Sequence, residues 1–383
     1  MNYELRNTKY ERRGFTLIEL VVAIGLLMIV ILFAGTIFKS SIGSYRIAMA
    51  QTEIMNKLRT ITQQLDTDFK GLRKDAPLFI WFQKGLNGPD DANRFDQIMF
   101  FADGDFQSTR LYSGAPKIPW PTGTPVVSNV ARIQYGHARV YSPTAGRFVD
   151  PCEQQFKVAI DPFFNINHRT LARRQHLYIA NPEPPQPQFA HFPEVAAGNL
   201  LVIKPNLNDS FEHDTNSLSE WQAAANDPIN GSANVNQIIT ACFSDDLYFS
   251  NHRPQINLAD TSTLHLLMTE GVGSFSVQWS YFYTNVSTGQ KFIYWWPSID
   301  PDGDGYFTDS DFSRMPTNPF GFYFNVAAPS FTNWFSYGGA IYLAGAVVEP
   351  IWPKAMKFTF TLYDSRGVFK EGQTFTHIVY LGD

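Results

Sequence analysis

The chain has 383 residues, of which 17% are charged and 15% aromatic, and its net charge at pH 7 is −5. This composition excludes a disordered protein and predicts a large buried core, in two or three domains or in one elongated domain. The mildly acidic balance gives no reason to expect nucleic acid as a partner, because an acidic surface repels phosphate. The eight histidines are scattered and no HExxH or CxxC occurs, which argues against a zinc site.

The first predicted element is an apolar helix over residues 15–38. At about 1.5 Å per residue, these 24 residues reach roughly 36 Å, enough to cross a bilayer core of ~30 Å. Residues 1–14 carry four basic side chains, which predicts that they stay in the cytoplasm while the rest is exported. A cleavable secretory signal would have a shorter apolar run and a small-x-small exit site. The sequence Arg12-Arg13-Gly14 suggests a twin-arginine signal, but an acidic residue in the apolar run and the missing exit site argue against one.

That acidic residue is Glu19, the fifth residue of the apolar stretch. A carboxylate inside a span costs about 2.5–3.5 kcal/mol at the helix centre and less near its end, so it is a functional hypothesis by default. One interpretation is that the side chain reaches out to the membrane interface. The other interpretation is that the carboxylate of Glu19 pairs with a positive charge. A cut between Gly14 and Phe15 would create an α-amino group four residues before Glu19, in this subunit or in a neighbour.

This stretch resembles the class III signal of type IV pilins and type II secretion pseudopilins. The matching features are a short basic leader ending in Gly14, then Phe15-Thr16-Leu17-Ile18-Glu19, then an unbroken apolar helix. The resemblance implies that a prepilin peptidase of the bacterial inner membrane cuts after Gly14 and N-methylates Phe15. It also implies that Glu19 guides assembly by meeting the terminal amine of a neighbouring subunit, and that the domain beyond the span is periplasmic.

Residues 39–73 are predicted to continue the helix as an amphipathic segment. Apolar side chains recur at steps of three and four residues, the pattern of one buried helical face, at Ile54, Leu58, Ile61, Leu65, Phe69 and Leu72. Pro77 ends any helix. We interpret this face as packing on the chain's own domain, and the resemblance implies that it lies on a β-sheet.

Residues 74–383 are predicted to form a β-rich globular domain. Short runs of β-branched and aromatic residues, bounded by turn-forming residues, predict strands at 96–103, 129–141, 273–284, 356–364 and 375–383. No alternation of strands with helices is visible, so the sheet is expected to be antiparallel. The predicted fold class is therefore α+β and pilin-like, with a long N-terminal helix packed on an antiparallel β-sheet domain. Residues 141–254, which include a proline-rich stretch, are expected to be a large insertion.

Looser resemblances concern the subclass. The stretches "GVGSFSVQWSYFY", "PKAMKFTFTLYD" and "QQLDTDFKGL" look like parts of the J-class minor pseudopilins. K-class subunits, which are also large, characteristically lack the glutamate, so Glu19 argues against that class. The J-class resemblance implies a tip complex with I- and K-class partners, formed through side-by-side helices.

The chain has two cysteines, Cys152 and Cys242. In an exported chain such a pair is a plausible single bridge, and the alternative is two buried thiols. A bridge would close a loop of about 90 residues, for which chain entropy suggests roughly 4–5 kcal/mol. Mass spectrometry of the unreduced protein distinguishes the two states.

The acidic stretch 300–311, "DPDGDGYFTDSD", has the layout of a calcium loop of the EF-hand type. Gly305 allows the sharp turn, and the candidate ligands are Asp300, Asp302, Asp304, Tyr306, Thr308 and Asp311. The last ligand is Asp where an EF-hand has Glu, and the flanks do not look helical, so a structural site in the ~10⁻⁴–10⁻³ M range is expected. The alternative is a solvated acidic turn.

Three functions were weighed. The first is a minor pilin or pseudopilin that enters a periplasmic fibre through its N-terminal helix, for protein export by type II secretion. The second is a minor subunit or tip adhesin of a type IV pilus, acting in adhesion, motility or DNA uptake. The third is an enzyme on a pilin-type anchor, which the sequence disfavours because it shows no catalytic triad, no convincing carboxylate pair and no nucleotide loop. The expected partners are the inner membrane, prepilin peptidase, other pilins or pseudopilins, and secreted protein cargo.

If the acidic loop binds calcium, chelation should lower the melting temperature of the purified protein, since the ion is bound only by the folded state. Differential scanning calorimetry with and without EGTA measures the change. An unchanged melting temperature would support the solvated turn.

Overall fold

The computed structural model describes residues 15–82, 94–112, 121–143, 146–149, 169–178, 218, 222, 254–260, 264, 266–285, 289, 291–296, 320–324, 346–348 and 353–382. A single long helix, α1 (Leu17–Lys70), precedes strands β1 to β14. The chain divides into two compact units, Met1–Thr52 and Glu53–Asp383.

The described part of the first unit is the N-terminal part of α1. Its most apolar 18-residue window has a mean hydropathy of 3.0, and none of that window is buried within the protein. A helix that is apolar on all sides and packs against no protein suits a lipid environment. This is the expected membrane-spanning helix by length and composition.

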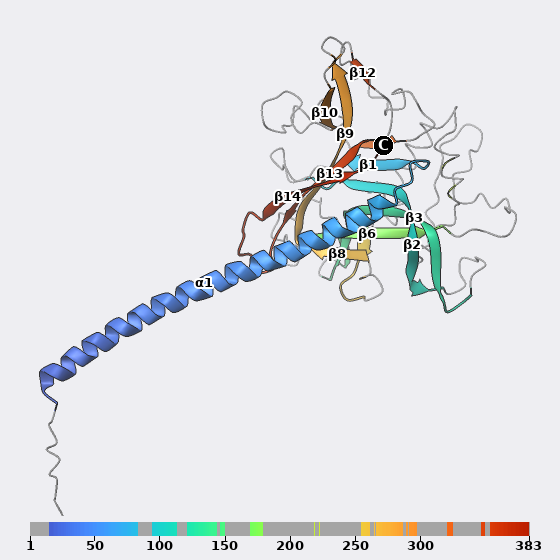
Figure 1. The fold of residues 1–383 in the computed structure, drawn as a ribbon. Helices are drawn as coiled ribbons and strands as arrows, with labels where there is room; N and C mark the ends of the chain where they lie inside the picture. The colour runs from blue at the N-terminus through green and yellow to red at the C-terminus, as the bar shows by residue number, and fades with distance from the viewer. Residues whose placement is uncertain are drawn as a thin grey trace, which may run out of the picture. The chain divides into compact units, whose positions relative to one another are not determined.

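The second unit is built from antiparallel sheets (Figure 1). A six-stranded sheet has the order β11-β1-β2-β3-β6-β8 and a five-stranded sheet the order β10-β9-β13-β14, with β12 also paired to β9. The strands of the six-stranded sheet are β1 (Leu78–Phe82), β2 (Gln97–Leu111), β3 (Pro125–His137), β6 (Thr170–Leu177), β8 (Leu267–Glu270) and β11 (Phe320–Phe324). Those of the five-stranded sheet are β9 (Val272–Asn285), β10 (Lys291–Trp296), β12 (Ala346–Val348), β13 (Ala355–Leu362) and β14 (Gln373–Tyr380).

A small third sheet has the order β5-β4-β7, formed by β4 (Arg139–Ser142), β5 (Arg147–Val149) and β7 (Gln255–Ile256). Its β4–β7 pair is parallel, and the other named pairs among the described strands are antiparallel. The α+β fold class is therefore confirmed. The five predicted strand regions coincide with β2, β3 with β4, β9, β13 and β14.

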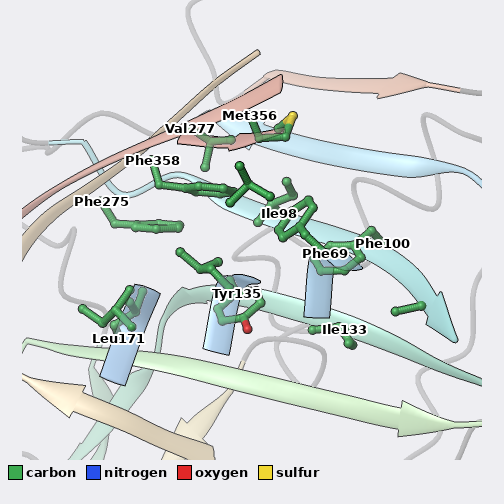
Figure 2. Close-up of a cluster of buried hydrophobic side chains, with 14 of the residues drawn as sticks. Phe69, Ile98, Phe100, Ile133, Tyr135, Leu171, Phe275, Val277, Met356 and Phe358 are labelled. Carbon is green, nitrogen blue, oxygen red and sulfur yellow. The ribbon is translucent and has the colours of Figure 1, made fainter. Parts of the chain in front are cut away.

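The predicted helical stripe packs into a core shared by both larger sheets. Ile54, Ile61 and Leu65 are fully buried. The ring of Phe69 lies 4.2 Å from that of Phe100 on β2 and 5.4 Å from that of Phe358 on β13, measured between centroids (Figure 2). One helical face thus contacts strands of both sheets, which joins them into one core.

Two findings differ in detail from the sequence-based expectation. The helix ends at Lys70 and not at Arg73, because Leu72 forms a β-bridge with Ala102 and the amide of Arg73 donates to the carbonyl of Phe101. In addition, β6 lies within the stretch 141–254 and pairs with both β3 and β8. That part of the presumed insertion is therefore an inner strand of the main sheet.

Gly71, just after α1, packs so closely against Asp103 of β2 that no larger residue fits. A Cβ at this position would lie 1.9 Å from the carbonyl oxygen of Asp103, whose own amide donates to Gly71 O at 2.7 Å. We expect Gly71→Ala to destabilise the domain by about 3 kcal/mol, because backbone on both sides must shift. Urea unfolding of the full chain in detergent, followed by tryptophan fluorescence, measures the loss.

Gly43→Ala is the matched control, since a Cβ at Gly43 has no atom within 4 Å. The domain's urea midpoint should not change in this variant. A Gly71→Ala midpoint equal to that of the control would show that the helix–strand junction is not rigid.

Candidate functional site

The start of α1 is capped by its own side chains. The Glu19 Oε2 atom accepts hydrogen bonds from the backbone amide and from the hydroxyl of Thr16, both at 2.9 Å. In return, the amide of Glu19 donates to Thr16 Oγ1 at 3.3 Å. This reciprocal pair is a capping box, with Thr16 at the N-cap and Glu19 three residues later, and it satisfies amides that a helix end leaves unpaired.

The capping box gives Glu19 a role within the single subunit. A carboxylate at this end of a helix is also favoured by the helix dipole. Both bonds go to Oε2, and no residue that the structure describes donates a hydrogen bond to Oε1. Phe15, Leu17 and Ile18 around it are exposed. The carboxylate is therefore oriented by Thr16 while one of its oxygens stays available to a group outside this chain.

Sequence reasoning overlooked this cap, although its signal is present. Thr16-x-x-Glu19 immediately before an apolar run is the sequence signature of a capping box. The two interpretations made from sequence, a side chain that reaches the membrane interface and a carboxylate that meets an amine, both left Thr16 out. The structure adds an interaction that holds the carboxylate before any partner arrives.

The other predicted site residues fall largely outside the described part of the chain. Phe15 is the first described residue, so the proposed cleavage at Gly14 is not visible, and Cys152 and Cys242 also lie outside. So do the six candidate calcium ligands Asp300, Asp302, Asp304, Tyr306, Thr308 and Asp311. Within the described ranges no group of three or more His, Cys, Asp or Glu side chains could hold a metal. The calcium loop and the disulfide remain predictions.

Beyond the membrane segment, a buried ion pair fixes the end of α1 to the six-stranded sheet. Asp68, only 3% exposed, accepts from Arg173 Nε at 2.6 Å and Arg173 Nη2 at 2.8 Å. Tyr135 of β3 also donates its hydroxyl to Asp68, and Gln64 donates at 3.1 Å. These hydrogen bonds offset the free-energy cost of removing the carboxylate from water.

The pKa values in this cluster follow from its burial. Burial, together with the neighbouring charge of Asp68, raises the pKa of Tyr135 well above its ordinary value, so the phenol stays protonated and donates. Burial alone would lower the pKa of Arg173, but the hydrogen bonds and charge of Asp68 raise it above its ordinary value. Tyr135 therefore stays a neutral donor and Arg173 stays cationic across the physiological range.

A second contact holds α1 to the turn between β13 and β14. Glu53 accepts from both the amide and the hydroxyl of Ser365, each at 2.9 Å. Lys57 pairs with Glu53 at 2.9 Å and donates to the carbonyl of Tyr363 at 2.8 Å. Helix and sheets are thus connected by polar contacts at both ends of the segment 53–70.

Comparison with known protein families gives a match at the start of the chain. Residues 10–35 match the family described as Prokaryotic N-terminal methylation motif. No match was found among curated proteins or among solved structures. The matched stretch contains the proposed cleavage point, Thr16, Glu19 and the first half of the apolar span.

The motif is the class III signal of type IV pilins and pseudopilins, and it implies processing by prepilin peptidase and assembly with other pilin-type subunits. The chain thus combines this N-terminal motif with a helix that is long and apolar enough to cross a membrane and with antiparallel sheets.

Removing one member of the buried pair should destabilise the domain strongly. Asp68→Ala leaves Arg173 without its carboxylate, and we expect a loss of about 3–5 kcal/mol. The double variant Asp68→Leu/Arg173→Met replaces the pair by apolar groups and should lose much less than the sum of the two single changes. Urea unfolding of the four proteins gives the coupling energy, and strictly additive losses would show that the pair is not coupled.

Proposed function

We propose that this chain is a minor subunit of a periplasmic pseudopilus of a type II secretion system, and that it acts in the tip or initiation complex for protein export. The observation that carries the proposal is the methylation motif at residues 10–35, placed at the start of one helix that is apolar for the length of a bilayer. The subunit would enter the fibre by packing this helix beside those of its neighbours.

The size of the exported domain favours a position at the end of the fibre. Residues 53–383 form one compact unit with several sheets attached to a single helix. Subunits stacked inside a helical fibre must share the space around closely packed helices. A large domain meets this restriction least at the tip, where nothing lies above it, and there it could also contact secreted cargo.

Assembly would depend on a second partner for Glu19, in addition to Thr16. In the proposed mechanism, cleavage after Gly14 exposes the amine of Phe15, which is then methylated and stays cationic. In lipid, this cationic amine and a carboxylate stabilise each other more strongly than neutral hydrogen-bonding groups stabilise either one. The open Oε1 of Glu19 would receive the amine of a neighbouring subunit while Thr16 holds Oε2.

A minor subunit or tip adhesin of a type IV pilus uses the same helix and the same signal, and it is the alternative. The surrounding genes distinguish the two systems. A secretion operon with a secretin supports the pseudopilus, and a pilus operon with a retraction ATPase supports the pilus.

Charge and capping at Glu19 can be separated by substitution. Glu19→Gln keeps the cap, since glutamine serves at this position of a capping box, but removes the charge. We expect this variant to be cleaved and methylated at Phe15 while its recovery in the assembled complex falls about tenfold, equivalent to ~1.4 kcal/mol. N-terminal mass spectrometry and affinity capture from host membranes measure the two effects.

Thr16→Val is the matched control, because it removes the side-chain cap and keeps the carboxylate. Its recovery should fall less than that of Glu19→Gln. Normal assembly of Glu19→Gln, or a mature chain that begins with Met1, would contradict the proposed mechanism.

A further inference from the structure

Strand β14 forms one edge of the five-stranded sheet (Figure 1). It pairs antiparallel with β13 over its whole length, from Gln373 opposite Leu362 to Tyr380 opposite Ala355, without a register shift. Among the strands that the structure describes, none pairs with its other side. The strand therefore ends its sheet as a straight, regular edge.

The direction of each backbone group on β14 follows from one hydrogen bond. The amide of Leu381 donates to the carbonyl of Lys354 at 3.0 Å, so this is a hydrogen-bonded pair of the ladder. Such pairs alternate with non-bonded ones in antiparallel strands. Phe375, His377 and Val379 therefore bond to β13, and the amides and carbonyls of Thr374, Thr376, Ile378 and Tyr380 point to the free side.

The sequence of β14 lacks the charged residues and prolines that usually protect an edge strand from pairing with another chain. Proteins shield edge strands with charges, prolines, bulges or shortness. The eight residues "QTFTHIVY" include no Lys, Arg, Asp, Glu or Pro. Strand β8, one edge of the six-stranded sheet, differs from β14 in these respects. It has only four residues, ends in Glu270 and lies beside a register shift.

The outer face of the sheet indicates what chemistry would fit beside β14. Hydroxyl groups contact one another across three strands: Ser274 with Thr361 at 3.2 Å, and Thr361 with Thr374 at 2.9 Å. A second row joins Thr359 to Thr376 at 3.4 Å. Both rows end at β14, where the threonines are exposed, as are Ile378 and Tyr380, the latter 81% exposed. A further strand with hydroxyl or β-branched side chains would continue these rows.

The direction of β14 argues against a second copy of this chain as the occupant. Glu53 contacts Ser365, Asp66 contacts His377 and Lys74 contacts Gly382, so β14 runs in the same direction as the helix segment beside it. Two identical edges paired antiparallel would point their helix segments in opposite directions. The proposed assembly packs neighbouring helices side by side in one direction, so two copies of this chain are not expected to pair through this edge.

We propose that the free edge of β14 receives an extended, uncharged strand from a different pilin-type subunit of the same assembly, by addition to the five-stranded sheet. This inference rests on the proposed function for the existence of the assembly. The backbone groups of Thr374, Thr376, Ile378 and Tyr380 provide the hydrogen bonds, and the threonine rows favour hydroxyl or β-branched side chains opposite them.

Hydrogen exchange resolved to single amides tests the proposal on the full-length mature chain. In the detergent-solubilised subunit, the amides of Thr374, Thr376 and Ile378 should exchange about tenfold or more faster than those of Phe375 and His377, which are bonded to β13. In the assembly extracted from host membranes, the first group should become as slow as the second.

Three results would overturn the inference, and they have different meanings. Fast exchange that persists in an intact assembly shows that the edge stays free, and it leaves the proposed function standing. Slow exchange in the isolated subunit that disappears on dilution identifies a second copy as the occupant. Failure to recover the processed chain with other pilin-type subunits counts against the proposed function itself, and the inference falls with it.

Substitutions at Thr376 separate the edge from the face. Thr376→Pro removes one free amide from a position where an edge strand tolerates proline, and Thr376→Val keeps the backbone and the shape. Recovery in the assembly should fall about fivefold or more for the first and stay unchanged for the second. If the proline variant has a lowered melting temperature, Ile378→Lys takes its place and should have the same effect. Normal assembly of a stably folded variant of either kind refutes the proposal.

Discussion

The packing of one helical face into a core shared by two sheets is the interaction on which this molecule depends. The N-terminal part of α1 is apolar all round and exposed, as suits a lipid environment, whereas the part beyond Glu53 buries only one stripe of side chains. Phe69 contacts both Phe100 and Phe358, so neither sheet completes the core without the helix. The buried Asp68–Arg173 pair and the contact of Glu53 with Ser365 then fix the position of the helix along the sheets. Any force applied to the membrane helix therefore reaches a structure that is held at several points.

At the other end of the helix, the capping box gives a physical account of a carboxylate in a lipid-facing segment. Glu19 is not an unpaired charge, because its side chain is already hydrogen-bonded within the single subunit. Thr16 supplies two donors to one carboxylate oxygen. The same residue types that begin a helix in water therefore serve here to orient an acid near the membrane interface, and the second oxygen stays accessible for contact between subunits.

The elements with a clear period could be predicted from sequence. The three- and four-residue steps from Ile54 to Phe69 predicted the packed half of the helix. Alternating residues such as Phe275 and Val277 or Phe358 and Phe360 predicted buried strand faces, as the structure confirms.

Strand β6 was not predicted, because "TLARRQHL" carries two arginines and a histidine that mask its pattern. These charges are tolerated because Arg173 meets Asp68, a residue 105 positions earlier. Such a pair has no local signal, since each member alone suggests an exposed surface. Likewise, the end of α1 at Lys70 depends on the close approach of Gly71 to Asp103, and the free edge of β14 depends on strand order. Neither can be read from one segment.

The position of these contacts along the chain also determines when folding can be completed during export. The N-terminal helix crosses or enters the membrane first, and the segment 53–70 follows with its apolar stripe and Asp68 still without their final neighbours. Arg173 emerges roughly a hundred residues later, and Phe358, which closes the core over Phe69, lies within the last stretch of the chain. Because Phe358 lies so late in the sequence, nearly the whole chain must be synthesised before the core can form. Until then the apolar stripe of residues 54–69 lacks the strands that cover it in the folded domain.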